Sequence, residues 1–452
     1  MGAPAIQTQL DEPLSALLAH ARAAGADAAD CIGVSGRSSA VSVRGGQLED
    51  IDNSEGSDIG LRVLVGRRQA CVSGSDLSAA ALQRLAERAV AMAKLAPEDP
   101  YCGLASEDRL STRMSADELE LADPATLTPD QLRTRALEVE AAALSVPGVR
   151  QAEGAQASYS LSSVRLLTSH GFSGGYSSTR FGTSVSAVAE RDGAMERDYD
   201  HASSRWLADL RGADEIGRKA GERAVRRLGA APMASGAMPI LFSRRVSGSL
   251  VGALLGAING AAVARGVSFL KDAMGEALFP AAVSITDDPL RARGLGSRPF
   301  DGEGVDVGRT DIIDAGRLTT WLLNSAAARQ LELDTTGHAA RGLSSPPGIS
   351  TSNVHLSAGA QSLDALIGQA GDGLLVREMF GPSLNPTTGD YSVGCSGTAI
   401  RGGQLAEAVS EVTIAGNLRD IFASLEAADD LHFDHEVNAP SVLVGGMTLA
   451  GT

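Results

Sequence analysis

The sequence predicts an α+β protein in which two-layer α/β domains at the N-terminal end are followed by a β-rich C-terminal domain. Segments between residues 29 and 73 alternate apolar and polar residues between glycine turns, which is typical of an antiparallel sheet. Residues 77–95 instead have apolar positions at helical spacing. Beyond residue 281, most segments are short, alternating and separated by Gly, Pro or Asn. Blocks of strands followed by helices, without a regular strand–helix repeat, favour the α+β class.

Changes in these patterns divide the chain into three expected domains. They are an N-terminal α+β domain, a middle α+β domain and a β-rich C-terminal domain, at residues 1–110, 111–232 and 233–452. In the first domain, one helix is predicted at residues 13–24, before the strands, and another at 77–95, after them. Ser78 is placed to cap the second helix, and Pro97 follows its last turn.

The middle domain follows a polar linker that runs from residue 97 to residue 127. Thr128 is expected to cap a helix that has Pro129 in its first turn, where the missing N–H costs no hydrogen bond. After that helix, three strands and a closing helix are predicted at residues 149–160, 163–169, 182–190 and 214–228.

The C-terminal domain is expected to open with a strand, AMPILFS, and then a helix rich in Gly and Ala at residues 246–264. Gly252, Gly256 and Gly260 recur every four residues in this helix and form a stripe of small residues. Such a stripe predicts close backbone contact, with the helix buried at an interface or under a sheet.

Composition and charge narrow the classes of function. Of the 452 residues, 43% are hydrophobic and 21% are charged, as in soluble globular proteins. The formal net charge of -16 repels phosphate backbones, so no nucleic-acid partner is expected. The basic residues between positions 218 and 227 fit the solvated face of an amphipathic helix.

The sequence also predicts a cytoplasmic protein without a membrane partner. The most apolar stretch, residues 250–263, is too short to cross a bilayer. The N-terminus lacks the basic and apolar regions of a signal peptide. The 4 cysteines include no C-x-x-C pair, which fits reduced thiols.

A search for catalytic motifs finds none. A helical zinc peptidase site needs two His at helical spacing and a Glu beside the first, and none of the 7 His belongs to such a motif. The best metal-like grouping is LHFDHE, with His432, His435 and Glu436, although a polar surface loop is the favoured interpretation. Ser396 in GCSGT departs from the nucleophile motif G-x-S-x-G, and Cys395 has no His nearby in the sequence.

Several longer segments carry a family resemblance. In chain order they are RDYDHASSRW (197–206), VSGSLVGALLGAINGAAVARGVSFLKD (246–272), SRPFDGEGV (297–305), TTGHAARG (335–342), NPTTGDYSVGCSG (385–397) and EVTIAGNLRDIF (411–422). Together they resemble the TldE/PmbA members of the TldD/TldE (PmbA/TldD) metallopeptidase family. Because the segments stand in the family's order along nearly the whole chain, they are more specific than any single short motif.

The resemblance implies that this chain lacks the catalytic metal. In TldD-type members, a His-Glu-x-x-x-His helix precedes a Gly-x-Ser segment. Aligning on residues 266–268 places Val251, Gly252 and Gly256 at the positions of the zinc motif, where none can bind a cation. The resemblance thus implies a non-catalytic subunit with no cofactor of its own. Zinc is expected in a TldD-type partner, and the heterodimer is expected to degrade or process unfolded peptides.

A substrate channel is expected in the β-rich domain, because strand edges accept extended peptides through main-chain hydrogen bonds. Asn385, Thr388, Asp390 and Ser392 form a polar run that either faces this channel or supports a turn. Arg341 is a further candidate, either for a substrate carboxylate or for a structural ion pair.

Two other functions stay open at this level. One is a stand-alone peptidase with an unrecognised metal site, for which His432, His435 and Glu436 are the least implausible ligands. The other is a homodimeric peptide-binding or regulatory protein that acts alone. A homodimer is also possible for the peptidase subunit when its partner is absent.

Overall fold

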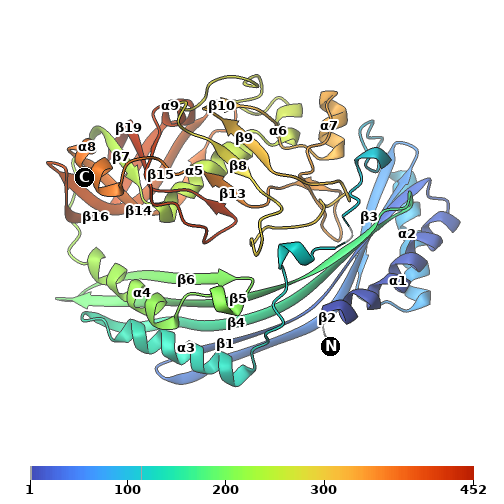
Figure 1. Ribbon diagram of the computed structural model, residues 1–452, viewed down its shortest axis with the longest axis horizontal. Coiled ribbons are helices and arrows are strands. Elements are labelled where there is room, and N and C mark those ends of the chain that lie inside the picture. Colours follow the sequence, from blue (N-terminus) through green and yellow to red (C-terminus); the bar gives the residue numbers. More distant parts are fainter. Residues whose placement is uncertain (1–2, 114, 452) are drawn as a thin grey trace.

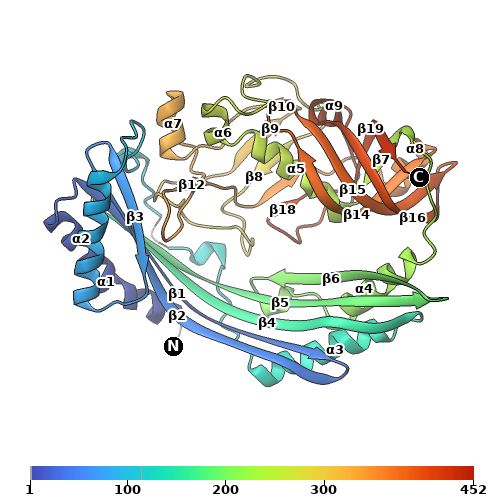
Figure 2. The ribbon, with the colours of Figure 1, turned by 180° about the vertical axis from the view of Figure 1, so that it is seen from behind.

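The computed structural model describes residues 3–113 and 115–451 of the protein, and it confirms the α+β class. Figure 1 shows a long curved sheet with helices along its outer side and the C-terminal domain within its concave side. Figure 2, the view from behind, shows α1 (Ala3–Ala23) and α2 (Ala79–Leu95) together at one end of the sheet. No described helix is both long and apolar enough to cross a membrane.

The long sheet consists of six antiparallel strands, which are β1 (Ala28–Arg44), β2 (Gln47–Val65), β3 (Arg68–Gly74), β4 (Val149–Thr168), β5 (Ser173–Arg191) and β6 (Ala194–Ser204). Their spatial order is β3-β2-β1-β4-β5-β6. β1 pairs with β4 from Asp30 opposite Thr168 to Val43 opposite Ala155. The sheet is therefore continuous across the boundary that the sequence predicts at residue 110. The expected strands at 149–160 and 163–169 are the single strand β4.

Side chains alternate between the two faces of this sheet, and β1 shows what each face contacts. Cys31 and Val41, at odd positions, belong to apolar clusters that include residues of the helices. Ile32, at an even position, clusters with Phe300 and Leu343 of the C-terminal domain. The sheet is thus covered by helices on one face and by the C-terminal domain on the other.

Two further helices, α3 (Pro129–Leu144) and α4 (Ala213–Arg227), cover the outer face of the sheet next to β4, β5 and β6. The predicted cap of α3 is confirmed, because Thr128 and Gln131 exchange hydrogen bonds in a capping box. Ser78 is the N-cap residue of α2, as predicted, although its side chain makes no capping hydrogen bond.

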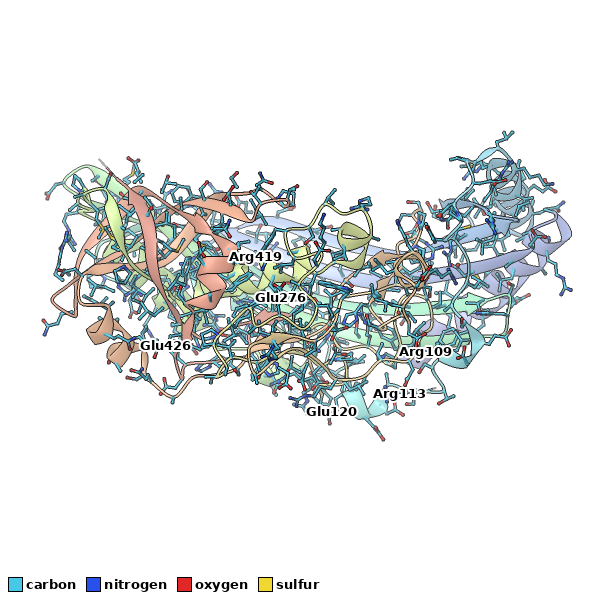
Figure 3. All side chains as sticks on the ribbon, turned by 90° about the horizontal axis from the view of Figure 1, so that it is seen from above. Arg109, Arg113, Glu120, Glu276, Arg419 and Glu426 are labelled. Carbon is cyan, nitrogen blue, oxygen red and sulfur yellow. The ribbon has the colours of Figure 1, made fainter. Side chains whose placement is uncertain are left out.

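The residues between α2 and α3 follow the surface of the C-terminal domain. They include the short 3-10 helices η1 (Glu107–Arg109) and η2 (Asp117–Leu119). The Ser111 N–H donates to Gly304 O at 2.9 Å, and Arg109 Nη2 donates to Thr335 O at 3.1 Å. Figure 3 labels three residues of this segment, Arg109, Arg113 and Glu120. The polar linker predicted here is therefore bound to the C-terminal domain.

The C-terminal domain has two main sheets and a two-stranded ribbon. The larger sheet contains β7 (Gly236–Phe242), β14 (Gly373–Leu384), β15 (Asp390–Arg401), β16 (Gln404–Asn417), β17 (Glu426–Ala427) and β19 (Val442–Ala450). The smaller contains β8 (Ile285–Asp287), β9 (Thr310–Asp314), β10 (Arg317–Leu318), β13 (Val354–Leu356) and β18 (Val437–Asn438). The ribbon joins β11 (Ala339–Ala340) to β12 (Gly348–Ile349).

In the larger sheet the strand order is β16-β15-β14-β7-β19-β17. Because β16 also pairs with β19, five of these strands close on themselves. The helices of the domain are α5 (Arg244–Ala257), α6 (Gly260–Ala264), α7 (Ser325–Leu331), α8 (Leu363–Ala370) and α9 (Leu418–Ala423).

The helix predicted at 246–264 is interrupted, because Ile258 leaves the helical conformation and Asn259 caps the new helix α6. The predicted role of its glycine stripe is wrong for two positions. A Cβ at Gly252 or Gly256 would meet nothing within 4 Å, so these glycines face open space. Gly260 alone of the three makes the expected close contact, since its Cβ would lie 2.4 Å from Leu323 Cδ2.

Asp30 joins the long sheet to the C-terminal domain through a buried network of ion pairs. Arg62 Nε on β2 lies 2.5 Å from Asp30 Oδ2, and Arg341 Nε of the C-terminal domain lies 2.8 Å from Asp30 Oδ1. All three side chains are at most 4% exposed. Burial raises the pKa of Asp30, but Arg62 and Arg341 more than offset this and hold that pKa below its ordinary value.

We expect Asp30→Asn to destabilise the protein by about 3–5 kcal/mol near neutral pH, because two buried guanidinium groups lose their counter-charge. Folding lowers the pKa of Asp30, so the stabilisation is complete above the unfolded-state pKa of about 3.9 and is lost as the pH falls through the folded-state value. The free energy of unfolding, measured by urea denaturation, should therefore differ most between the two proteins at neutral pH.

Asp214→Asn is the matched control, because Asp214 pairs with Arg218 at 2.7 Å on the surface of α4. That exposed pair is expected to contribute less than about 1 kcal/mol. Equal destabilisation by the two variants, or a difference for Asp30→Asn that persists unchanged in acid, would contradict this role of Asp30.

A second prediction concerns the contact between α3 and α4. A Cβ at Gly217 would lie 2.4 Å from Val139 O and 2.6 Å from Ala142 Cβ. We expect Gly217→Ala to lower the free energy of unfolding by about 1–3 kcal/mol, because the helices must separate. Gly368→Ala in α8, where a Cβ meets nothing within 4 Å, should be neutral or stabilising by up to about 1 kcal/mol. Equal effects would show that close approach of the helices is unimportant.

Candidate functional site

Helix α5 carries the three positions that the resemblance aligns with the zinc motif. Val251 is apolar and 2% exposed, within the core of the C-terminal domain. Gly252 and Gly256 lie on the exposed side of the helix. Because none of the three supplies a nitrogen, oxygen or sulfur atom from its side chain, zinc does not fit this helix. One side of α5 presents bare backbone instead.

Asn385, Thr388 and Asp390 form a hydrogen-bonded turn between β14 and β15. Asn385 Oδ1 accepts from the Thr387 N–H at 3.0 Å, and Thr388 Oγ1 donates to Asp390 Oδ2 at 2.6 Å. Asn417 Nδ2 donates to Asp390 Oδ1 at 3.1 Å, and the bonds from Thr388 and Asn417 lower the pKa of Asp390. These exposed side chains therefore support the turn, and their place in a substrate channel stays a prediction.

Three of the segments that carry the resemblance meet at this turn. The Phe269 N–H, from the segment that follows α6, donates to Pro386 O at 2.7 Å. Arg419 on α9 donates to Phe269 O at 3.1 Å and pairs with Glu276 at 3.0 Å. Figure 3 shows Arg419 and Glu276 next to one another. The turn is thus fixed by contacts from segments far apart in the sequence.

Ser392 and Cys395 lie beyond the turn on β15. Ser392 is half-buried and pairs with Ala415 on β16. Cys395 is fully buried, and burial raises the pKa of its thiol to about 12. A buried, protonated thiol is a poor nucleophile, and Cys395 therefore has the environment of a cysteine packed in the core.

Arg341 makes the structural ion pair that was one of its two expected roles. Besides its contact with Asp30, its Nη1 donates to Ser345 O at 2.6 Å. With a side chain 1% exposed, Arg341 points into the junction between the long sheet and the C-terminal domain.

The LHFDHE segment forms an exposed loop before β18. Asn438 Oδ1 accepts from the backbone N–H groups of Asp434 and His435 at 3.0 and 2.9 Å. The His435 ring lies 5.5 Å from that of His201 on β6. Across residues 3–113 and 115–451, no group of three His, Cys, Asp or Glu side chains is placed to hold a metal ion.

Three cavities lie between the C-terminal domain and the part of the molecule formed by β6 and α4, and they share lining residues. The first and second cavities share Arg244 and Arg245 in their lining. The second and third share His201 and His435. Their volumes are about 210, 70 and 280 Å³. Together they form a row of small spaces with walls rich in arginine.

The interpretation of residues 218–227 as a solvated helix face is wrong for two of its arginines. Arg223 Nη1 lies 2.9 Å from Asp200 Oδ1, and Arg227 Nε lies 3.0 Å from Glu196 Oε2. Both carboxylates are on β6, so these arginines point toward the sheet and the cavities. Arg218 and Arg226 are the exposed members of the helix.

The residues at this junction are the ones that sequence reasoning missed. A signal was present, because Glu196, Asp198 and Asp200 alternate along β6 and must share one face of the strand. An acidic strand face of this kind predicts a basic partner, and the basic helix at residues 218–227 is the nearest candidate in the sequence. Arg245, which pairs with Asp198 at 2.7 Å, and Arg377 on β14 had no comparable signal, since each comes from a distant segment.

Three parts of the sequence match the domains of one metallopeptidase family. Residues 29–93 match the PmbA/TldA metallopeptidase domain 1, residues 122–228 its central domain and residues 235–451 its C-terminal domain. The predicted boundaries at residues 110 and 232 fall in the two gaps between these matches.

Similar proteins are found among characterised sequences. The metalloprotease PmbA of Escherichia coli is 35% identical over 414 residues, which is 91% of this chain and 89% of that protein. A PmbA homologue from Haemophilus influenzae is 32% identical over 451 residues, which is 98% of this chain and 97% of that protein.

Solved structures have the same fold. TldE from Thermococcus kodakarensis superposes with a TM-score of 0.84 at 19% identity, over 97% of this chain and 100% of that one. A protein from Bacteroides thetaiotaomicron, described as a candidate modulator of DNA gyrase, gives a TM-score of 0.91 at 26% identity over 99% and 100%. The sequence matches to all three domains and the identity to PmbA proteins show that this chain belongs to the PmbA/TldD metallopeptidase family, as a member of its PmbA/TldE branch.

Proposed function

We propose that the chain is a non-catalytic subunit that pairs with a TldD-type zinc subunit in a cytoplasmic peptidase. The assembly degrades or processes unfolded peptides. The observation that carries the proposal is that α5 retains its helical form while Val251, Gly252 and Gly256 stand at the positions aligned with the zinc motif. Zinc in the assembly then comes from the partner.

The open side of α5 favours a role for this helix in contacting another chain. Gly252 and Gly256 are one turn apart, so both expose backbone on the same side. Another chain can approach such a surface more closely than it can approach a helix covered by side chains. Glycine at these two positions costs helix stability, by about 1 kcal/mol each relative to alanine, which favours a role that requires the absence of a side chain.

A cytoplasmic location is part of the same proposal. The 4 cysteines of the described chain are all free, and Cys31 and Cys395 are buried. Unpaired thiols are typical of proteins that work in a reducing compartment.

Co-expression with a TldD-type protein tests this function. We expect a stable heterodimer on gel filtration and hydrolysis of an unfolded peptide such as casein, with neither chain active alone. Failure to form a complex, or casein hydrolysis by this chain alone, would contradict the proposal. A homodimer that persists in excess partner would favour the peptide-binding alternative.

A pair of variants tests α5 within that experiment. Gly252→Trp adds a large side chain to the open face, and we expect the isolated chain to fold normally but the complex to lose at least about tenfold in affinity or activity. Gly368→Trp on α8 is the control, because that helical glycine also has nothing within 4 Å of its Cβ position. Equal results for the two variants would exclude a role for the glycine face of α5.

A further inference from the structure

A cavity of about 210 Å³ lies where α4, the N-terminal end of α5, β14 and β15 meet. The charged residues of its lining are Arg223, Arg226, Arg227, Arg244, Arg245, Arg377, Asp198, Glu378 and Asp430. The lining thus holds six arginines and three carboxylates, and three more carboxylates outside the lining pair with Arg223, Arg227 and Arg244. The cavity belongs to both halves of the molecule, because α4 packs on the long sheet and the other elements belong to the C-terminal domain.

Four of these arginines have acidic partners within 4 Å. The pairs are Arg223–Asp200, Arg227–Glu196, Arg244–Asp434 and Arg245–Asp198. The carboxylates of the lining are also engaged, since Glu378 pairs with Arg227 and Asp430 accepts two hydrogen bonds from Ser441. Within the described part of the chain, no acidic partner lies within 4 Å of Arg226 or Arg377.

Arg377 is the most exceptional of the group. It lies on β14 at an irregularity between Val376 and Glu378, and its Nε donates to Thr398 Oγ1 at 3.0 Å. Burial, together with Arg226 and Arg223, lowers the pKa of Arg377 to about 10. The guanidinium therefore stays charged at neutral pH, in surroundings that disfavour its charge. Asp198 offsets this in part, but no carboxylate of the described residues lies within 4 Å of Arg377, and a bound anion would lower the cost of burying its charge.

A neutral hydrogen-bond donor, the hydroxyl of Ser243, also lines the cavity. Ser243 is the N-cap residue of the 14-residue helix α5, and its side chain makes no capping hydrogen bond. Its Oγ is buried and has no hydrogen-bond partner among the described residues. A buried hydroxyl without a partner is uncommon, and the N-terminal end of a helix adds positive potential at the same place.

We propose that this cavity binds a small ligand with two or more negative charges on oxygen atoms, of the size of inorganic pyrophosphate. Arg377 and Arg226 are its ionic partners, and Ser243 donates a hydrogen bond to it. The volume is below the roughly 300–1,000 Å³ of sites for drug-sized ligands, so a small anion fits this cavity better than a large cofactor does. Since the walls come from α4 and from the C-terminal domain, the ligand also holds these two parts together.

Calorimetric titration of the full chain with pyrophosphate tests the site. We expect one site per chain and affinity that falls as salt is added, because the contacts are ionic. Arg377→Gln should weaken binding by about tenfold or more, as expected for loss of a charged hydrogen bond. Arg218→Gln, which removes an exposed arginine of α4 paired with Asp214, should bind as the unchanged protein does.

Arg226→Gln keeps the proposal testable if Arg377→Gln does not fold, because Arg226 is exposed and no carboxylate of the described residues lies within 4 Å of it. It should also weaken pyrophosphate binding while leaving the unliganded melting temperature unchanged. A parallel titration with citrate distinguishes the source of the charge, since equal binding identifies a general oxyanion site and weaker binding a phosphate site. The proposal is overturned if neither anion binds at millimolar concentration, or if Arg226→Gln and Arg218→Gln bind pyrophosphate equally well.

Discussion

The buried carboxylate of Asp30 fixes how the long sheet meets the C-terminal domain. It lies on the face of β1 that points away from the helices, and it accepts from Arg62 of the sheet and Arg341 of the other domain. Removing Asp30 leaves two buried guanidinium groups without their carboxylate, and because Arg62 and Arg341 come from different domains, the network forms only when both domains are in place. Ile32, two residues along the same strand and on the same face, packs in an apolar cluster with Phe300 of the C-terminal domain.

Much of the fold could be predicted from the sequence, where the signal is local. The alternation along residues 29–73 predicted the antiparallel strands β1 to β3, and Thr128 predicted the start of α3. The pairing of β1 with β4 could not be predicted, because more than a hundred residues separate Asp30 from Thr168 and strand pairing is set by tertiary contacts. The glycine spacing in α5 showed that one face is small but not that this face is open.

The candidate site was predictable in part for the same reason. Zinc is bound only by particular side chains, mainly Cys, His, Asp and Glu. Once the family is known, Val251, Gly252 and Gly256 therefore indicate from the sequence alone that the zinc ligands are missing. The two roles of Arg341 could be separated only by finding Asp30 beside it. The arginine-rich cavity depends on residues from many distant segments, and only the alternating acids of β6 pointed toward it.

The distribution of zinc between the two chains tests most directly whether this chain is a peptidase subunit without its own metal. The chain is purified alone and in complex with a TldD-type partner, and zinc is counted per chain by elemental analysis. We predict that this chain alone binds no zinc and that the heterodimer binds one zinc, which is lost when the partner's metal ligands are replaced. Stoichiometric zinc in this chain alone, removed by His432→Ala, would contradict it.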